Sequence, residues 1–439
     1  MNIFQYLDQI GQSLLVIPFL FLLLGSIILS FKTRFVQIRT IPTMIKLLLG
    51  SLFTKNNKTT KHTIKAHRAL FTAMATAFGI GNIVAPIVAI GFGGPGALLG
   101  FLIAAFFGTA TAFTEVTFAL SYRKKMPNGK IMGGPMQYLK EGVSKNLALI
   151  YAISGCIMLL SWSGKQTNTL AVLLKSYSIP TYFTGIVVAI LTSIVLLKGI
   201  KMIGNIAEKL VPTMFMLYAG AILYILALNI GNIPFAIKLI FQSAFTPQAL
   251  AGAGVGVGLQ QALRWGLSEA TFANEAGVGT ITIPHSMAQT ESSVDQGILS
   301  MISVYTSGFL SLISGLAIIA SGAWIASPTA SFDITMISDM LRAHFSFVGP
   351  IILIITVILF AFTSILGNCY NGSQCFLFAT KNRWLHRYYG LIALVIFACA
   401  IVDVKTLWSL GGYFIVPVAI PNIIGVVALA FKRADLLKK

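Results

Sequence analysis

Charged residues are scarce in this sequence. Only 10% of its 439 residues are Asp, Glu, Lys or Arg, whereas an ordinary soluble domain has about 25%. Hydrophobic residues make up 56% of the chain, and they come in runs long enough to cross a bilayer, which takes about 20 largely uncharged residues per helix. The composition therefore excludes a water-soluble enzyme and predicts a protein that crosses a membrane many times.

Cysteine and histidine are also too few to form the usual metal or catalytic motifs. The four cysteines lie in or beside hydrophobic runs without a CxxC pair, so we interpret them as packing residues: Cys156, Cys369, Cys375 and Cys399. No HExxH motif and no Ser/His or paired Asp constellation falls in the hydrophobic runs, which argues against an enzyme. An ion channel is the alternative from another class, but no selectivity-filter repeat or voltage-sensing arginine series is present.

Hydropathy over windows of about 19 residues predicts eleven membrane-spanning helices. They lie near residues 12–31, 70–92, 96–121, 147–164, 179–198, 211–230, 256–284, 298–325, 347–375, 387–402 and 409–431. Most lysines and arginines fall in alternate gaps between these helices, which predicts an external N-terminus and a cytoplasmic C-terminus in a cell membrane, such as a bacterial inner membrane. The same pattern explains the net charge of +19 without a nucleic-acid partner.

Two predicted spans are interrupted by glycine. The first break is the Gly-Ile-Gly at residues 79–81, and the second is the Gly-Val-Gly at residues 277–279. Unwound backbone within a membrane survives only where it is buried in protein or lines a cavity. Without the N-terminal helix, each break falls in the first span of a set of five, which predicts two repeats of opposite orientation with a binding site between them.

The predicted fold is therefore an all-α membrane protein with an inverted 5+5 repeat, two broken helices and one extra N-terminal helix. Its expected parts are the extra helix (1–31), a cytoplasmic connector (32–69), the first five-helix repeat (70–230), the second repeat (231–431) and a cytoplasmic tail (432–439). In the connector, residues 34–53 mix basic and apolar side chains. They predict a helix lying on the cytoplasmic leaflet, with a soluble linker as the alternative.

Several ordered motifs resemble the alanine or glycine:cation symporter family. They are GIGN (79–82), the segment 93–123, GGPMQYL (133–139), AEKLVP (207–212), RWGL (264–267), ANEAGVG (273–279) and TSILG (363–367). The resemblance covers nearly the whole chain. It implies the superfold of amino-acid and neurotransmitter sodium symporters, and a protein that imports alanine or glycine with co-transported sodium. A proton-coupled transporter, or one of broader amino-acid specificity, is the alternative within this fold.

An amino acid presents a carboxylate and an ammonium group to such a site. The half-helix that starts after the first break offers free N–H groups and a positive dipole end, so we place the carboxylate on the N–H groups of Ile80 and Gly81. We place the ammonium on the last carbonyls before the second break, near Phe272 and Asn274. The resemblance adds Gln166, for which an interhelical hydrogen bond is the alternative role. The predicted substrate residues are Thr76, Gly79, Ile80, Gly81, Asn82, Gln166, Phe272, Asn274 and Gly277.

A sodium ion is a small, hard cation that prefers about five or six oxygen ligands. Thr363 and Ser364 place two adjacent hydroxyls in the middle of a span. The resemblance implies that these hydroxyls, with the carbonyls of Phe360, Ala75 and Phe78, form a sodium site. The local alternative is that each hydroxyl bonds a carbonyl of its own helix.

Three acids and one lysine fall within predicted spans, where charged residues are rare and usually functional. We expect Glu115 to brace helices, whereas Glu275 either caps the unwound segment or lines the path. Lys165 and Glu269 depart from the family pattern. The hypothesis is that they face each other across the cavity as a compensating pair; the alternative is that Lys165 exchanges a proton and couples transport to protons.

Overall fold

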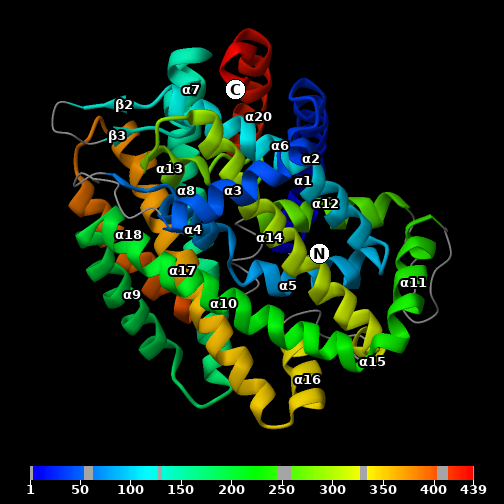
Figure 1. Cartoon of the computed structure of the whole chain (residues 1–439). Helices are drawn as coiled ribbons and strands as arrows, with labels where there is room; N and C mark the ends of the chain where they lie inside the picture. Colours follow the sequence, from blue (N-terminus) through cyan, green and yellow to red (C-terminus); the bar gives the residue numbers. More distant parts are fainter. Residues whose placement is uncertain are drawn as a thin grey trace.

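The computed structural model describes residues 3–53, 63–126, 131–245, 259–326, 334–402 and 414–438, and every structural statement below refers to these residues. Helices account for most of them (Figure 1). The helices up to residue 228 are α1 (Ile3–Lys32), α2 (Val36–Arg39), α3 (Ile41–Phe53), α4 (Ala66–Ala77), α5 (Gly81–Gly93), α6 (Ala97–Ser121), α7 (Pro135–Gly142), α8 (Lys145–Lys175), α9 (Thr181–Lys198) and α10 (Ile200–Leu228). The later ones are α11 (Ile233–Phe245), α12 (Leu259–Asn274), α13 (Thr282–Ser286), α14 (Ser293–Ala320), α15 (Ala323–Ala326), α16 (Ile334–Phe345), α17 (Val348–Ala379), α18 (Leu385–Ile401) and α20 (Val416–Lys432).

The remaining elements are short. Two 3-10 turns, η1 (Ile230–Asn232) and η2 (Ala434–Leu437), follow α10 and α20. Strand β1 (Ile64–Lys65) pairs in parallel with β4 (Ala288–Gln289), and β2 (Lys124–Lys125) pairs antiparallel with β3 (Ile131–Met132). The β1–β4 pair connects the segment before α4 to the segment after α13. It therefore links the two broken helices at the ends that lie away from their breaks.

Each of the eleven predicted spans overlaps a helix or a broken helix pair in the described part of the chain. Within the described residues, six helices are long and apolar enough to cross a membrane, namely α6, α8, α9, α10, α14 and α17, and the bent pair α4–α5 makes a seventh. The count of eleven stays a prediction, because α1, the α12–α13 pair, α18 and α20 are not among these seven in the described part of the chain. The hydropathy pattern missed the short helices α7, α11 and α16.

The helices turn apolar side chains outward and many hydroxyls inward. On α9, Ile186, Ile190 and Leu197 are exposed. The inner face of α14 instead carries a stripe of fully buried serines at helical spacing, Ser300, Ser303, Ser307, Ser311 and Ser314. Small and hydroxylated residues let helices approach closely and hydrogen-bond in a membrane, where lipid is as apolar as leucine.

Corresponding helices of the two predicted repeats pack on each other. Extensive interhelix contacts join α5 to α12, α6 to α14, α8 to α17 and α9 to α18, and α6 also packs extensively on α12. Counted from each broken helix, the first four pairs join the first, second, third and fourth members of the two sets of five, in that order. Packing of helices on their counterparts is expected where they lie close to a two-fold axis between the repeats, so these four pairs support the inverted repeat.

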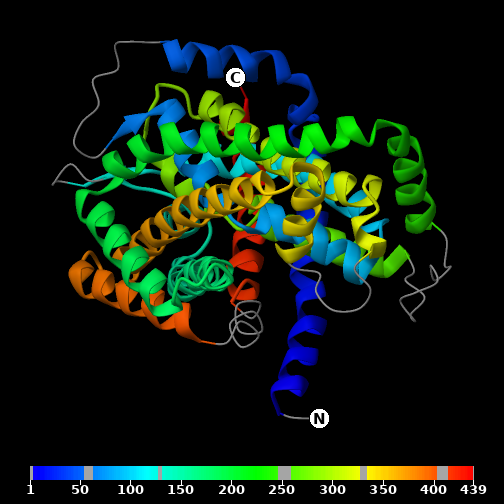
Figure 2. The ribbon, with the colours of Figure 1, turned by 90° about the horizontal axis from the view of Figure 1, so that it is seen from below.

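The chain ends lie on opposite sides of the molecule. Figure 2 shows the N-terminus of α1 at one end, with the C-terminus and the crosswise helix α3 at the other. Helix α3 has no buried residue, and Ile45, Leu49 and Phe53 are among its exposed side chains. The helix predicted over residues 34–53 is therefore only partly correct: α2 and α3 are separated at Thr40, and Arg34 and Phe35 have left-handed backbone conformations. The position of α3 on the cytoplasmic leaflet and the external N-terminus stay predictions.

Candidate functional site

Both helix breaks occur where the glycine pattern places them. Helix α4 ends at Ala77 and α5 begins at Gly81, with a bend of 40° between them. Helix α12 ends at Asn274, after which Glu275 (φ 54°), Gly277 (φ 84°) and Gly279 (φ 87°) adopt left-handed backbone conformations. Glycine adopts positive φ at little cost, whereas Glu275 does so at a cost of about 1–2 kcal/mol.

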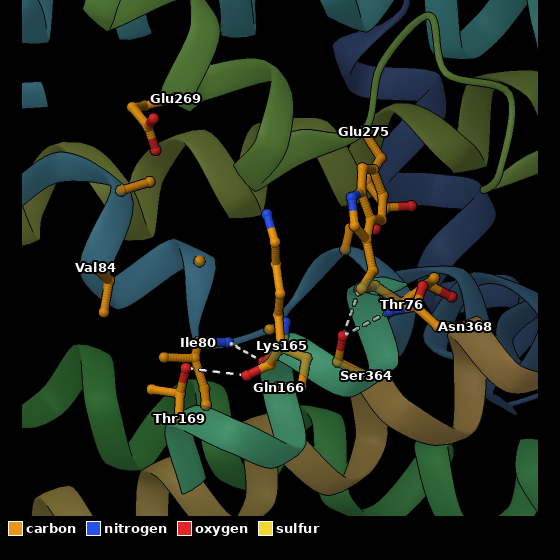
Figure 3. A pocket seen from close by; sticks show the side chains of 15 residues that line it. Thr76, Ile80, Val84, Lys165, Gln166, Thr169, Glu269, Glu275, Ser364 and Asn368 are labelled. Carbon is orange, nitrogen blue, oxygen red and sulfur yellow. Dashed lines mark hydrogen bonds between the residues drawn. The ribbon is translucent and has the colours of Figure 1, made fainter. Parts of the chain in front are cut away.

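The breaks border one cavity of about 70 Å³, which has room for several water molecules. Four structural parts line it: the first break and its flanks, α8, the α12 segment with the second break, and α17 (Figure 3). The lining residues are Thr76, Ala77, Gly79, Ile80, Gly81, Val84, Ala85, Trp162, Lys165, Gln166, Thr169, Glu269, Glu275, Ser364 and Asn368.

The first break meets α8 through Gln166. The backbone N–H of Ile80 donates a hydrogen bond of 3.0 Å to Gln166 Oε1 (Figure 3). A Cβ at Gly79 would collide with the Gln166 amide and lie 3.0 Å from Ser364 Oγ. Glycine is therefore needed at residue 79 for space rather than for positive φ. In this conformation the Gln166 amide oxygen accepts a hydrogen bond from Ile80 N–H, which is one of the two N–H groups predicted to bind the substrate carboxylate.

Side chains from three helices satisfy the carbonyls of the second break. The Tyr151 hydroxyl of α8 donates to Val278 O at 2.9 Å, and Asn371 Nδ2 of α17 donates to Thr280 O at 3.1 Å. Asn422 Nδ2 of α20 donates to the carbonyl of the first glycine of the break at 2.9 Å. Each unsatisfied backbone group inside a membrane costs several kcal/mol, so these three contacts keep the unwound segment stable.

Glu115 belongs to the same network but lies outside the cavity. Its Oε1 accepts a 2.5 Å hydrogen bond from Asn422 Nδ2, and the Tyr138 hydroxyl donates to Asn422 Oδ1. Glu115 is fully buried. It thus connects α6 to α20 beside the second break, in agreement with the predicted bracing role.

Asn82 joins the two breaks to each other. Its Nδ2 donates to the carbonyls of Ala77, at 2.6 Å, and Ala273, at 3.3 Å. The Ser307 hydroxyl of α14 lies 2.6 Å from Asn82 Oδ1 and 2.7 Å from Ala273 O. Asn82 is fully buried and does not line the cavity. Its contacts therefore fix the last turns of α4 and α12 relative to α14.

The predicted sodium ligands from α4 and α17 lie close together. The Ser364 hydroxyl donates to Thr76 O at 3.1 Å, and the rings of Phe78 and Phe360 stack with centroids 6.4 Å apart. The Thr363 hydroxyl bonds carbonyls of its own helix, at 2.8 Å and 3.2 Å, as the local alternative describes. These contacts place Ser364 and Phe360 of α17 against the end of α4, and the sodium site itself stays a prediction.

The predicted substrate residues divide between the cavity and its surroundings. Thr76, Gly79, Ile80, Gly81 and Gln166 line the cavity, whereas Asn82, Asn274 and Gly277 do not. The Asn274 side chain instead accepts a 3.0 Å hydrogen bond from the backbone N–H of Ala276. Phe272 lies in α12, but its side chain is outside the described part of the chain.

Sequence reasoning missed several lining residues that helical spacing could have found. Trp162 and Thr169 lie four residues before and three after Gln166 on α8, and Asn368 lies four after Ser364 on α17. Residues three and four apart share one face of a helix. The sequence motifs predicted single positions on α8 and α17. Including the residues three and four positions away on the same helix would have added Trp162, Thr169 and Asn368.

Lys165 and Glu269 line the same cavity, from α8 and α12 respectively. Figure 3 shows the Lys165 side chain reaching from α8 into the cavity. The two groups interact electrostatically. That they face each other across the cavity as a compensating pair stays a hypothesis, which charge reversal tests.

Comparison with known proteins gives a consistent result. The family model described as the sodium:alanine symporter family matches residues 1–439. The chain belongs to the sodium:alanine symporter family. It is similar to an uncharacterized transporter of Haemophilus influenzae, 32% identical over 435 residues that cover 98% of this chain and 94% of that protein. It is also similar to the sodium/alanine symporter AgcS of Methanococcus maripaludis, 34% identical over 424 residues that cover 94% of this chain and 91% of that protein.

A solved structure shows the same fold. The crystal structure of MhsT in complex with L-phenylalanine matches this structure with a TM-score of 0.60 and 17% sequence identity, covering 84% of this chain and 89% of that chain. Membership of the sodium:alanine symporter family confirms the resemblance read from the motifs. The protein is a multi-pass membrane protein and a sodium-coupled amino-acid symporter, and its family is one of transporters rather than enzymes.

Proposed function

We propose that this symporter imports a small neutral amino acid, alanine or glycine, with sodium across the cell membrane. The observation that carries the proposal is that both helix breaks open onto one cavity, with helix N-terminal N–H groups on one side and carboxylate and amide oxygens on the other. These are complementary to the two ends of a zwitterion. The name of the similar M. maripaludis protein, a sodium/alanine symporter, supports alanine in particular.

The substrate carboxylate binds where α5 begins. The first N–H groups of a helix have no partner within it and carry the positive end of its dipole. The carboxylate takes the N–H groups of Ile80 and Gly81, and the Gln166 amide, which holds Ile80 N–H at 3.0 Å, turns to donate to the carboxylate instead. Each such charge-assisted bond contributes about 1.5–3 kcal/mol.

The substrate side chain is small because the cavity is small. Its volume is about 70 Å³, and Val84, Ala85 and Trp162 are among the residues that line it. A methyl group or a hydrogen fits with little rearrangement. A larger side chain requires lining residues to move, so we expect affinity to fall with the size of the side chain.

Sodium binds beside the first break. Thr363 and Ser364 provide hydroxyls, and Ala75, Phe78 and Phe360 provide carbonyls. Support comes from the contact of Ser364 with the carbonyl end of α4, 3.1 Å from Thr76 O. When sodium arrives, the hydroxyls give up their hydrogen bonds to carbonyls and turn their oxygens to the ion. The ion then links α4 to α17, which couples sodium binding to the position of the broken helix.

The proposed orientation follows from the basic residues. The N-terminus lies outside and the C-terminus in the cytoplasm, with residues 70–230 and 231–431 as the two repeats and residues 1–31 as an added helix. The connector (32–69) and the tail (432–439) are cytoplasmic. Alternating access comes from rocking one helix bundle against the other around the central cavity.

Uptake by purified protein in proteoliposomes tests the proposal. Labelled alanine should accumulate when sodium is high outside, fail to accumulate in choline, and be displaced by glycine and alanine far better than by large amino acids. The Glu141→Gln variant is the matched control, because Glu141 forms an ion pair with Lys124 (2.8 Å) and neither residue lines the cavity. Equal uptake in sodium and choline would refute sodium coupling.

One observation favours a second candidate, proton coupling. Lys165 places an exchangeable proton within the cavity. Accumulation driven by an imposed pH gradient without a sodium gradient would favour this candidate. Accumulation driven by the sodium gradient alone would exclude it.

A further inference from the structure

Glu275 is the one cavity acid without a charged partner among the described residues. Three charged side chains line the cavity: Lys165, Glu269 and Glu275. Lys165 and Glu269 interact with each other. No described basic side chain lies within ion-pair distance of Glu275, whose Oε2 accepts a hydrogen bond from the Thr280 hydroxyl. One carboxylate oxygen is thus oriented by the protein, while the residue itself borders the cavity.

Asn368 supplies a second oxygen on the same cavity. It is 1% exposed, and its Nδ2 donates to Ser364 Oγ at 3.3 Å. Its Oδ1 is buried without a hydrogen-bond partner in the described part of the chain. A buried amide oxygen without a partner costs about 1–3 kcal/mol. The Glu275 carboxylate and the Asn368 amide oxygen can therefore both accept a hydrogen bond from a ligand. No hydrogen bond joins these two side chains in the described part of the chain.

We propose that Glu275 and Asn368 bind the α-ammonium group of the substrate. This inference rests on the proposed function and replaces the carbonyls near Asn274 as the ammonium site. A primary ammonium has three donors and one positive charge, so it satisfies the Glu275 carboxylate and the Asn368 oxygen together. The opposite end of the zwitterion then faces the start of α5, where Ile80 N–H lies.

Comparison of alanine with lactate isolates the ammonium contact. L-Lactate has a hydroxyl where L-alanine has the ammonium and is otherwise the same size. Binding of both to purified protein is measured by competition in saturating sodium, for the wild type, Glu275→Gln and Glu275→Asp. We expect Glu275→Gln to reduce the wild-type preference for alanine over lactate by about ten- to a hundredfold, and Glu275→Asp to retain most of it. An unchanged preference in Glu275→Gln overturns the inference.

Sodium binding without substrate separates this role from that of a sodium ligand. Direct binding of sodium should change less than about threefold in Glu275→Gln if Glu275 holds the ammonium. Loss of substrate-free sodium binding would assign Glu275 to sodium and overturn the inference. If Glu275→Gln does not fold, Asn368→Ala gives the same test, with an expected three- to tenfold loss of preference for alanine over lactate, about one neutral hydrogen bond.

Failure of this inference and failure of the proposed function give different results. If the wild type binds neither alanine nor glycine in sodium, the proposed function is wrong. If it binds alanine and Glu275→Gln leaves the preference over lactate intact, the function stands and the ammonium lies elsewhere. Glu141→Gln, at the exposed ion pair with Lys124, should match the wild type in every measurement.

Discussion

Replacing Asn82 with alanine should loosen both helix breaks at once. Asn82 hydrogen-bonds the carbonyls of Ala77 and Ala273 and the Ser307 hydroxyl. Interhelical hydrogen bonds in a membrane are worth about 0.6 kcal/mol each on average. Loss of these three contacts therefore costs about 2 kcal/mol, which corresponds to about a thirtyfold change in an equilibrium constant. We expect alanine affinity to fall by up to that factor, since the ordered breaks are the form that binds substrate.

Replacing Ser307 with alanine should also lower alanine affinity, but by less than Asn82→Ala does. It removes the contacts with Asn82 and with Ala273 O, worth about 1 kcal/mol together, or about fivefold. Ser307 does not line the cavity, so it changes binding only through the breaks. The assay is alanine binding in saturating sodium, with thermal unfolding measured in parallel. If Ser307→Ala binds like the wild type while Asn82→Ala loses binding entirely, Asn82 contacts the substrate directly and the bridging role is refuted.

Four further substitutions have expected outcomes. Gly79→Ala pushes a Cβ into the Gln166 amide and should lower alanine affinity about tenfold or more, since overpacking costs about 1–3 kcal/mol; wild-type affinity would contradict the close packing. Gly266→Ala directs a Cβ against a backbone oxygen of α6 and should lower the thermal unfolding midpoint in detergent, which an unchanged midpoint would disprove. Lys165→Glu and Glu269→Lys should each reduce uptake at least about tenfold, and the double exchange should restore it if the two charges compensate; absence of rescue removes that hypothesis.

The helices and the place of the breaks were predictable because their causes are local. A run of about 20 apolar residues forms a spanning helix wherever it occurs, and Gly-x-Gly within such a run marks an unwound segment. Why each break requires glycine was harder to predict from the sequence. Gly277 and Gly279 have positive φ, but Gly79 is required by Gln166, which lies 87 residues later in the chain, and no local pattern reveals that contact.

The partners of the second break could not be predicted, because they come from distant helices. Tyr151, Asn371 and Asn422 each donate to a carbonyl of this segment, and nothing in their own neighbourhoods distinguishes them from other polar residues in spans. The same holds for Asn82. Its position beside the first break suggested a substrate contact, whereas its contacts with Ala273 and Ser307 arise only when α12 and α14 pack against α5.

A high-resolution structure with alanine and sodium bound tests the central claim most directly. That claim is that two unwound segments hold a zwitterion between them. We predict the carboxylate within hydrogen-bond distance of the N–H groups of Ile80 and Gly81, with the Gln166 amide turned away from Ile80, and the ammonium beside Glu275. Alanine bound elsewhere, or a continuous helix through residues 78–81 in the bound state, would contradict the account.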